Sequence, residues 1–198
     1  DPLSINILMT PIDTLPWYKF PNNFSIIIKS ATDLIKEYAG SKICSLGQTG
    51  AWIVKAAELL TLKHDTGCTF EYIPFSGKFY KVISLNGIEQ KPDIEYELCN
   101  SQVLEFYSQY YKTLTDLTLT PKDIIRYHND TNSKVVILEF TSTGAGLASF
   151  MSILFNWSKA TGLLEQFKKA IAIVILNDSE QEAQRIKSIT VEKEKIEI

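Results

Sequence analysis

The stretch VVILEFTSTGAGL, from Val135 to Leu147, decides the fold expected for this chain. It begins with four apolar residues and continues through an acid and a Thr/Ser-rich turn that ends Thr-Gly-Ala-Gly, and an apolar run to Trp157 follows. That order predicts a buried strand, a tight loop and a helix. Small residues leave backbone N–H groups open to a ligand, and the positive end of a helix attracts anions. The stretch therefore predicts a site for a phosphate-bearing ligand.

A second strand–turn–helix unit lies earlier in the chain. Lys42 to Leu46 is a strand candidate, Gly47-Gln48-Thr49-Gly50 is a turn, and a helix is expected from Ala51 to Leu62. Strands that alternate with helices predict an α/β domain with a mainly parallel sheet flanked by helices. Ligands of such sheets bind at the carboxyl ends of the strands. Because both glycine turns follow strand ends, we expect them to share one rim and to face one ligand.

The other elements are expected to belong to the same domain, which spans residues 1–198. Thr120-Pro121-Lys122-Asp123 is typical of a helix start, with proline at the first helical position and an acid at the third. The remaining predicted elements are an extended segment over 1–23, a strand over 24–28, a helix over 30–38, a hairpin insertion over 69–85, a mainly helical stretch over 94–117, a helix over 163–169, a buried strand over 170–176, a helix over 179–187, and an edge strand or flexible tail over 188–198.

Composition excludes several classes of protein. The net charge of −3 does not indicate binding to nucleic acid or to an anionic membrane surface. No apolar run approaches the roughly 20 residues that a membrane-spanning helix needs. Cys44, Cys68 and Cys99 form no metal-binding or redox spacing, so we expect free thiols in a reducing, cytoplasmic setting. His64 and His128 lie far from any nucleophile pattern. A Ser–His or Cys–His triad is therefore not expected.

The 135–147 stretch resembles the phosphoribosyl-pyrophosphate loop of type I phosphoribosyltransferases, in which a buried strand leads through two acids to a Thr-Gly turn. Counted back from Thr143-Gly144, Glu139 matches the second acid, and the resemblance makes it the partner of the ribose hydroxyls. A carboxylate suits a diol because it accepts two O–H donors. Ser142 to Ala145 match the turn that holds the 5′-phosphate. The resemblance thus implies a phosphoribosyltransferase-like fold.

The turn at 47–50 resembles the pyrophosphate loop of the same family, and with a pyrophosphate the resemblance implies Mg²⁺. The 69–85 hairpin lies where the family carries a mobile loop that closes on substrate; Ser76, Lys78 and Tyr80 are present there, without a motif that would assign them a role. Apart from Glu139, the candidate binding residues are Gly47, Gln48, Thr49, Gly50, Thr141, Ser142, Thr143, Gly144, Ala145 and Gly146.

Two positions depart from the family pattern. Counted back from the Thr-Gly turn, Leu138 stands where the first acid is usual; counted from the strand, Glu139 is the first acid and Phe140 replaces the second. Gly146 stands where a Ser or Thr is usual. One hypothesis is a protein that binds a phosphorylated ribose or nucleotide and transfers the phosphoribosyl group to a nitrogen nucleophile. The alternative is a non-catalytic descendant that serves as a ligand sensor or a protein-interaction module. Two simpler interpretations also stay open: the loop is only a turn with an N-cap, and Glu139 caps a neighbouring helix. A homodimer is compatible with either function.

Overall fold

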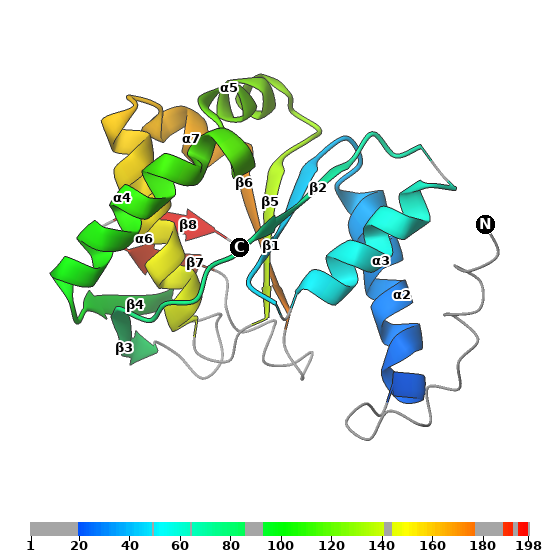
Figure 1. Cartoon of the computed structure of the whole chain (residues 1–198), viewed down its shortest axis with the longest axis horizontal. Coiled ribbons are helices and arrows are strands. Elements are labelled where there is room, and N and C mark those ends of the chain that lie inside the picture. Colours follow the sequence, from blue (N-terminus) through cyan, green and yellow to red (C-terminus); the bar gives the residue numbers. More distant parts are fainter. Residues whose placement is uncertain are drawn as a thin grey trace.

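A computed structural model describes residues 20–48, 50–63, 65–85, 93–140, 144–176, 188–191 and 194–197 (Figure 1). In chain order its elements are α2 (Phe20–Glu37), β1 (Lys42–Leu46), α3 (Ala51–Thr61), β2 (Thr69–Ile73), β3 (Tyr80–Leu85), β4 (Asp93–Leu98), α4 (Ser101–Thr118), α5 (Pro121–Asn129), β5 (Val135–Phe140), α6 (Ala145–Ala160), α7 (Leu164–Ala170), β6 (Ile171–Leu176), β7 (Ser188–Val191) and β8 (Glu194–Glu197).

Four parallel strands form one sheet, in the order β2-β1-β5-β6. Lys42, at the start of β1, pairs with Thr69 of β2 on one side and with Val135 of β5 on the other. Val135 in turn lies opposite Ile171 of β6. The amino ends of the four strands therefore lie side by side, and their carboxyl ends lie together at the opposite end of the sheet. The prediction of an α/β fold with a mainly parallel sheet and flanking helices is confirmed.

Strand side chains alternate between two apolar layers. Ile43 and Leu138 pack with residues of α2 and α3 on one face. Cys44 and Ile137 pack with residues of α6 on the opposite face. Figure 1 shows the same division, with α2 and α3 on one side of the sheet and α4, α6 and α7 on the other. Because both faces are covered, a run such as Val135 to Leu138 is buried throughout and shows no polar alternation.

A second, smaller sheet has the strand order β3-β4-β7-β8. β3 and β4 form an antiparallel hairpin, β7 pairs with β4 in parallel, and β8 completes the edge by pairing antiparallel with β7. The expected hairpin over 69–85 is therefore wrong in its partners. Residues 69–73 form β2 and pair with β1 of the parallel sheet, and β3 turns back on β4 instead. Alternation and turn residues do not specify which strand is the partner, because pairing is a long-range choice.

Two local predictions are also corrected. Residues 94–98, expected to be helical, belong to strand β4; their sequence Ile-Glu-Tyr-Glu-Leu alternates with a period of two, which favours a strand. Helix α4 begins after them, where the Asn100 side chain accepts a hydrogen bond from the Val103 N–H at 3.1 Å. Residues 24–28, expected to be a strand, lie within α2, and the predicted start at Ser30 falls inside this helix.

Helix α2 is stabilised by tertiary packing. Ala31, Leu34 and Ile35 recur at helical spacing and are buried against α3 and the sheet. The helix begins at Phe20, so residues 20–23 of the expected extended segment are helical, and residues 1–19 lie outside the described part of the chain. The predicted helix over 179–187 also lies outside it. Residues 188–191 and 194–197 form β7 and β8, with β8 at the sheet edge.

Candidate functional site

The carboxyl ends of β1 and β5 mark the point where the chain reverses its direction across the sheet. From β1 the chain passes through α3, on one face, to β2. From β5 it passes through α6, on the opposite face, to β6. The two connections diverge and leave a crevice between the ends of β1 and β5. Crevices at such switch points are where open α/β sheets bind ligands.

A cavity of about 740 Å³ lies at this point, and we call it the rim cavity. Its volume is in the range of small-molecule sites. It is lined by Leu46, Gly47, Gln48, Tyr72, Pro74, Phe75, Ser76, Gly77, Lys78, Glu139, Phe140 and Gly146. The cavity therefore brings together parts of both predicted glycine turns and the predicted carboxylate. Gly50, Gly144 and Ala145 do not line it, and Thr49, Thr141, Ser142 and Thr143 lie outside the described residues.

The first glycine turn is shaped by contacts with β2 and the loop after it. Gly47 adopts a left-handed conformation, with φ +66°, and its N–H donates to the Ile73 carbonyl oxygen at 3.0 Å. The Ser45 hydroxyl donates to the Gly47 carbonyl oxygen at 3.0 Å. The Gly47 N–H is therefore engaged by β2, and the part of this turn that could contact a diphosphate lies after Gly47. Gly50 packs inward instead: a Cβ there would stand 2.6 Å from Leu138 Cδ2.

Gly47→Ala is expected to lower the free energy of unfolding by about 2 kcal/mol or more, measured by denaturant titration. The left-handed backbone disfavours any side chain, and an added Cβ would lie 3.2 Å from the Phe75 carbonyl oxygen. Gly162 is the matched control, since it has φ +72° and no atom within 4 Å of an added Cβ. We expect Gly162→Ala to cost about 1 kcal/mol. Equal losses would show that the Phe75 contact is unimportant.

The second glycine turn leads into α6, a helix of 16 residues. Gly144 is its N-cap, with φ 75°, and as a glycine it has no side chain of its own to cap this end. Ala145 is buried in the apolar layer, whereas Gly146 faces the rim cavity. A Cβ on Gly146 would come within 3.3 Å of Glu139 Oε1. The absence of a side chain therefore lets the first turn of α6 approach the carboxyl group closely, and the positive end of the helix dipole points to the cavity.

Glu139 is the carboxyl group of the rim cavity. Leu138, at the first-acid position, lies fully buried in the opposite layer, so the two positions do not form a pair. Burial raises the pKa of Glu139 to about 7, against an opposing effect of the Lys78 charge. Its Oε2 atom is buried and has no hydrogen-bond partner among the described residues. An unpartnered carboxyl oxygen in a cavity is what a ligand with hydroxyl or amine donors would satisfy.

Lys78 is carried by the loop between β2 and β3, over residues 74–79. The Tyr107 hydroxyl donates to the Ser76 carbonyl oxygen at 2.8 Å, and the Phe79 N–H donates to Ser149 Oγ at 3.0 Å. The rings of Phe75, Phe79, Tyr107 and Phe150 pack together beneath the loop. This anchoring places Ser76, Gly77 and Lys78 along the rim cavity. No motif in the sequence indicates a role for Ser76 or Lys78. Their place at the cavity depends on the pairing of β2 with β1, which the sequence does not predict.

Ser149→Ala is expected to lower the free energy of unfolding by about 2 kcal/mol, because the buried Phe79 N–H would lose its acceptor. Ser152 is a matched control on the same helix: it is equally buried, and its hydroxyl donates to the Ala148 carbonyl oxygen at 3.1 Å. Since Ser152 holds no backbone N–H among the described residues, Ser152→Ala should cost less than about 1 kcal/mol. Denaturant titration compares the two variants, and similar losses would contradict the anchoring role of Ser149.

The side chains that line the rim cavity do not form a metal site by themselves. Within the described residues, no three His, Cys, Asp or Glu side chains gather as metal ligands. Glu139 is the one acidic residue among those lining the rim cavity. Mg²⁺ prefers six oxygen ligands in near-octahedral geometry. The described side chains therefore do not fit Mg²⁺ as a resident ion.

Within the described part of the chain, no helix combines the length and the apolar character that crossing a bilayer requires. No protein-family model matches the sequence, and no curated protein is significantly similar to it.

Proposed function

We propose that this protein has a phosphoribosyltransferase-like fold and binds a phosphorylated ribose or a nucleotide in the rim cavity. One observation carries the proposal: a glycine turn, a carboxyl group, a lysine and the start of a long helix surround a single cavity at the switch point of the sheet. Each group suits a different part of the ligand. Phosphate requires positive charge and N–H donors, and a ribose diol requires an acceptor of two O–H bonds.

The phosphate lies, in this proposal, between the first turn of α6 and Lys78. Gly146 lines the cavity at the helix start, and Lys78 faces it from the 74–79 loop. The dipole of the helix and the ammonium charge both favour an anion there. Thr143 and Gly144 retain the role implied by the resemblance, that of the turn around the 5′-phosphate. A turn that served only as an N-cap would not require the cavity or the lysine beside it.

The ribose hydroxyls lie, in this proposal, against Glu139. Its buried Oε2 has no partner among the described residues, and two ligand O–H groups would satisfy both carboxylate oxygens. Such bonds favour the ionised carboxylate, so binding would lower the pKa of Glu139 and release a proton near pH 7. We therefore expect affinity to rise with pH up to about 7 and then to level off.

Calorimetric and thermal titrations with ribose 5-phosphate, adenosine 5′-monophosphate and phosphoribosyl pyrophosphate, with and without Mg²⁺, test the proposal. A ligand at about 100 Kd should raise the free energy of unfolding by roughly 2.7 kcal/mol. Lys78→Met should weaken binding, whereas Lys122→Met, an exposed lysine on α5 beyond the opposite end of the sheet, should not. The proposal fails if none of the ligands stabilises the protein, or if inorganic phosphate alone reproduces the full effect.

Binding without transfer is the second candidate, and the single carboxyl group favours it. Transfer would form a bond from a nitrogen lone pair to C1 of the ribose while the C1–O bond breaks and its electron pair leaves with pyrophosphate. That step develops positive charge on the ribose ring. One carboxylate stabilises this charge less well than a pair of acids does. Pyrophosphate release from phosphoribosyl pyrophosphate, measured with a mixture of nucleobases, separates the two. Release that depends on Glu139 indicates a transferase, and ligand stabilisation without release indicates a sensor or interaction module.

A further inference from the structure

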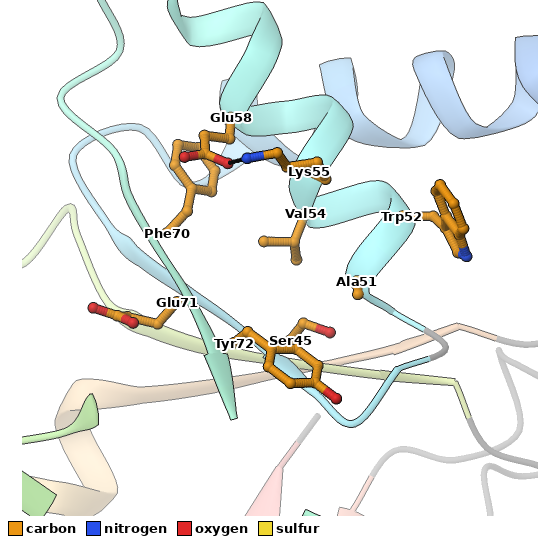
Figure 2. A pocket seen from close by; sticks show the side chains of 9 residues that line it. All are labelled: Ser45, Ala51, Trp52, Val54, Lys55, Glu58, Phe70, Glu71 and Tyr72. Carbon is orange, nitrogen blue, oxygen red and sulfur yellow. Dashed lines mark hydrogen bonds and ion pairs between the residues drawn. The ribbon is translucent and has the colours of Figure 1, made fainter. Parts of the chain in front are cut away.

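A second cavity, of about 450 Å³, lies between helix α3 and strand β2, and we call it the side cavity (Figure 2). On the helix it is lined by Ala51, Trp52, Val54, Lys55 and Glu58, and all of these except Trp52 share one face because they follow a spacing of three, four and seven residues. Among the described residues β2 is the edge strand of the parallel sheet, so this cavity borders that edge. It belongs to neither of the predicted glycine turns.

Two aromatic rings dominate the strand side of the side cavity. Phe70 and Tyr72 are two residues apart on β2 and therefore project to the same face. Figure 2 shows both rings opposite Val54, while the ring of Trp52, which also lines the cavity, is turned away from them. The Glu58 carboxylate stands at the end near Phe70 and pairs with the Lys55 ammonium at 2.6 Å. The side cavity therefore offers flat apolar surface with an acceptor at one end.

Tyr72 joins the side cavity to the rim cavity, since it lines both. The residues at the end of β1 are divided between them in the same way, with Ser45 beside the side cavity and Leu46 beside the rim cavity. Tyr72 is 44% exposed, so its ring is accessible at the junction. A ligand whose phosphate and sugar occupy the rim cavity would have its next group directed past Tyr72.

We propose that the side cavity binds the planar, amino-bearing ring of a nucleotide whose sugar phosphate occupies the rim cavity, an inference that rests on the proposed function. Its size suits a heterocycle, and pockets of this kind combine apolar walls with a few placed polar groups. Aromatic side chains stack on nucleobases irrespective of sequence. One Glu58 oxygen accepts from Lys55, and the remaining acceptor capacity of this carboxylate, together with the Tyr72 hydroxyl, suits a ring that donates hydrogen bonds.

Calorimetric titration of the whole chain with ribose 5-phosphate and with adenosine 5′-monophosphate tests this inference. The two ligands share the sugar phosphate and differ in the ring. We expect the nucleotide to bind about 10- to 100-fold more tightly, as stacking on aromatic side chains implies. Glu58→Gln should weaken the nucleotide by about tenfold and leave ribose 5-phosphate unchanged.

Ala51→Phe provides a second variant, because it fills the side cavity from the start of α3. It should abolish the advantage of the nucleotide over ribose 5-phosphate. Leu59→Phe is its matched control: it adds an aromatic ring on the same helix, at a residue that is 56% exposed and outside the cavity lining. Thermal unfolding confirms that both variants fold.

The outcomes separate the two proposals. If ribose 5-phosphate binds and the nucleotide binds no more tightly, the ring site is wrong and the proposed function stands. The ring site is also wrong if the nucleotide gains affinity that neither Glu58→Gln nor Ala51→Phe reduces. If neither ligand binds, the proposed function itself fails.

Discussion

Glu139→Gln is expected to stabilise the unliganded protein at pH 8 by up to about 3 kcal/mol, while abolishing the stabilisation by phosphorylated ribose. Burial raises the pKa of the Glu139 carboxyl from 4.5 to about 7, and each pH unit corresponds to about 1.4 kcal/mol. Above pH 7 the folded protein holds an ionised carboxylate in a poorly solvated place, which is unfavourable. Glutamine has nearly the same shape and carries no charge. The same substitution replaces one of the two acceptor oxygens that the ribose diol requires with an NH2 donor and removes the negative charge.

The pH dependence of this effect has a definite sign. Between about pH 4.5 and 7 the folded protein binds more protons at Glu139 than the unfolded chain, so its stability falls as pH rises through that window. The gain from Glu139→Gln should therefore be near zero at pH 4.5 and grow to its full value above pH 7. Urea titrations at several pH values measure it.

Glu97→Gln is the matched control for this experiment. Glu97 is an exposed residue on β4 whose carboxylate pairs with the Lys81 ammonium at 2.9 Å, and exposed pairs contribute little. We expect a change of less than about 1 kcal/mol with no effect on ligand binding. If Glu139→Gln were neutral at pH 8, or if the variant kept the ligand-induced stabilisation, the assigned role of this carboxyl group would be wrong.

Asp123→Asn is expected to lower the free energy of unfolding by about 3 kcal/mol at pH 7. Asp123 Oδ2 lies 3.1 Å from Lys42 Nζ and also accepts hydrogen bonds from the Thr120 N–H and hydroxyl at the start of α5. The two charged side chains are 11% and 22% exposed, so the substitution would leave the Lys42 ammonium nearly buried and without its carboxylate. The double variant Lys42→Met/Asp123→Asn should recover part of the loss, because it removes that charge.

The contact between Asp123 and Lys42 also makes the free energy of unfolding depend on pH. Burial raises the pKa of Asp123, but the hydrogen bonds from Thr120 and the charge of Lys42 outweigh burial and hold the pKa below its usual value. The contribution is complete above the ordinary pKa of an aspartate and is lost as pH falls through the lowered value. The difference between wild type and Asp123→Asn should therefore shrink at low pH. Lys168→Met, which breaks the ion pair with the exposed Glu165, is the control; an equal loss there would contradict the prediction.

The local part of the fold is readable from the sequence. Four apolar residues before Glu139 predict the buried strand β5, and the small residues before Leu147 predict the turn into α6. Thr120 and Asp123 predict the capping box that begins α5. Each of these signals depends on residues close together in the chain, and hydrophobic period and capping chemistry are both local properties.

Strand partners and the composition of the site are not local. Residues 69–73 alternate as a hairpin strand would, yet they pair in parallel with β1, because a partner is selected by the packing of distant elements. The same choice brings the 74–79 loop, and with it Lys78, across the end of the sheet to Glu139. It also uses the Gly47 N–H in the contact with Ile73. No pattern within either glycine turn could have predicted those neighbours.

The sequence by itself therefore determined an α/β domain with two glycine turns and one carboxylate candidate. The tertiary structure alone decided that Glu139 is largely buried beside Gly146, that its Oε2 has no partner among the described residues, and that its pKa is raised to about 7. The physical reason is that burial and charge are set by whatever surrounds a side chain in space. A carboxyl group at the end of a strand is an ordinary acid while water surrounds it. It becomes a candidate ligand-binding group only when the fold removes that water.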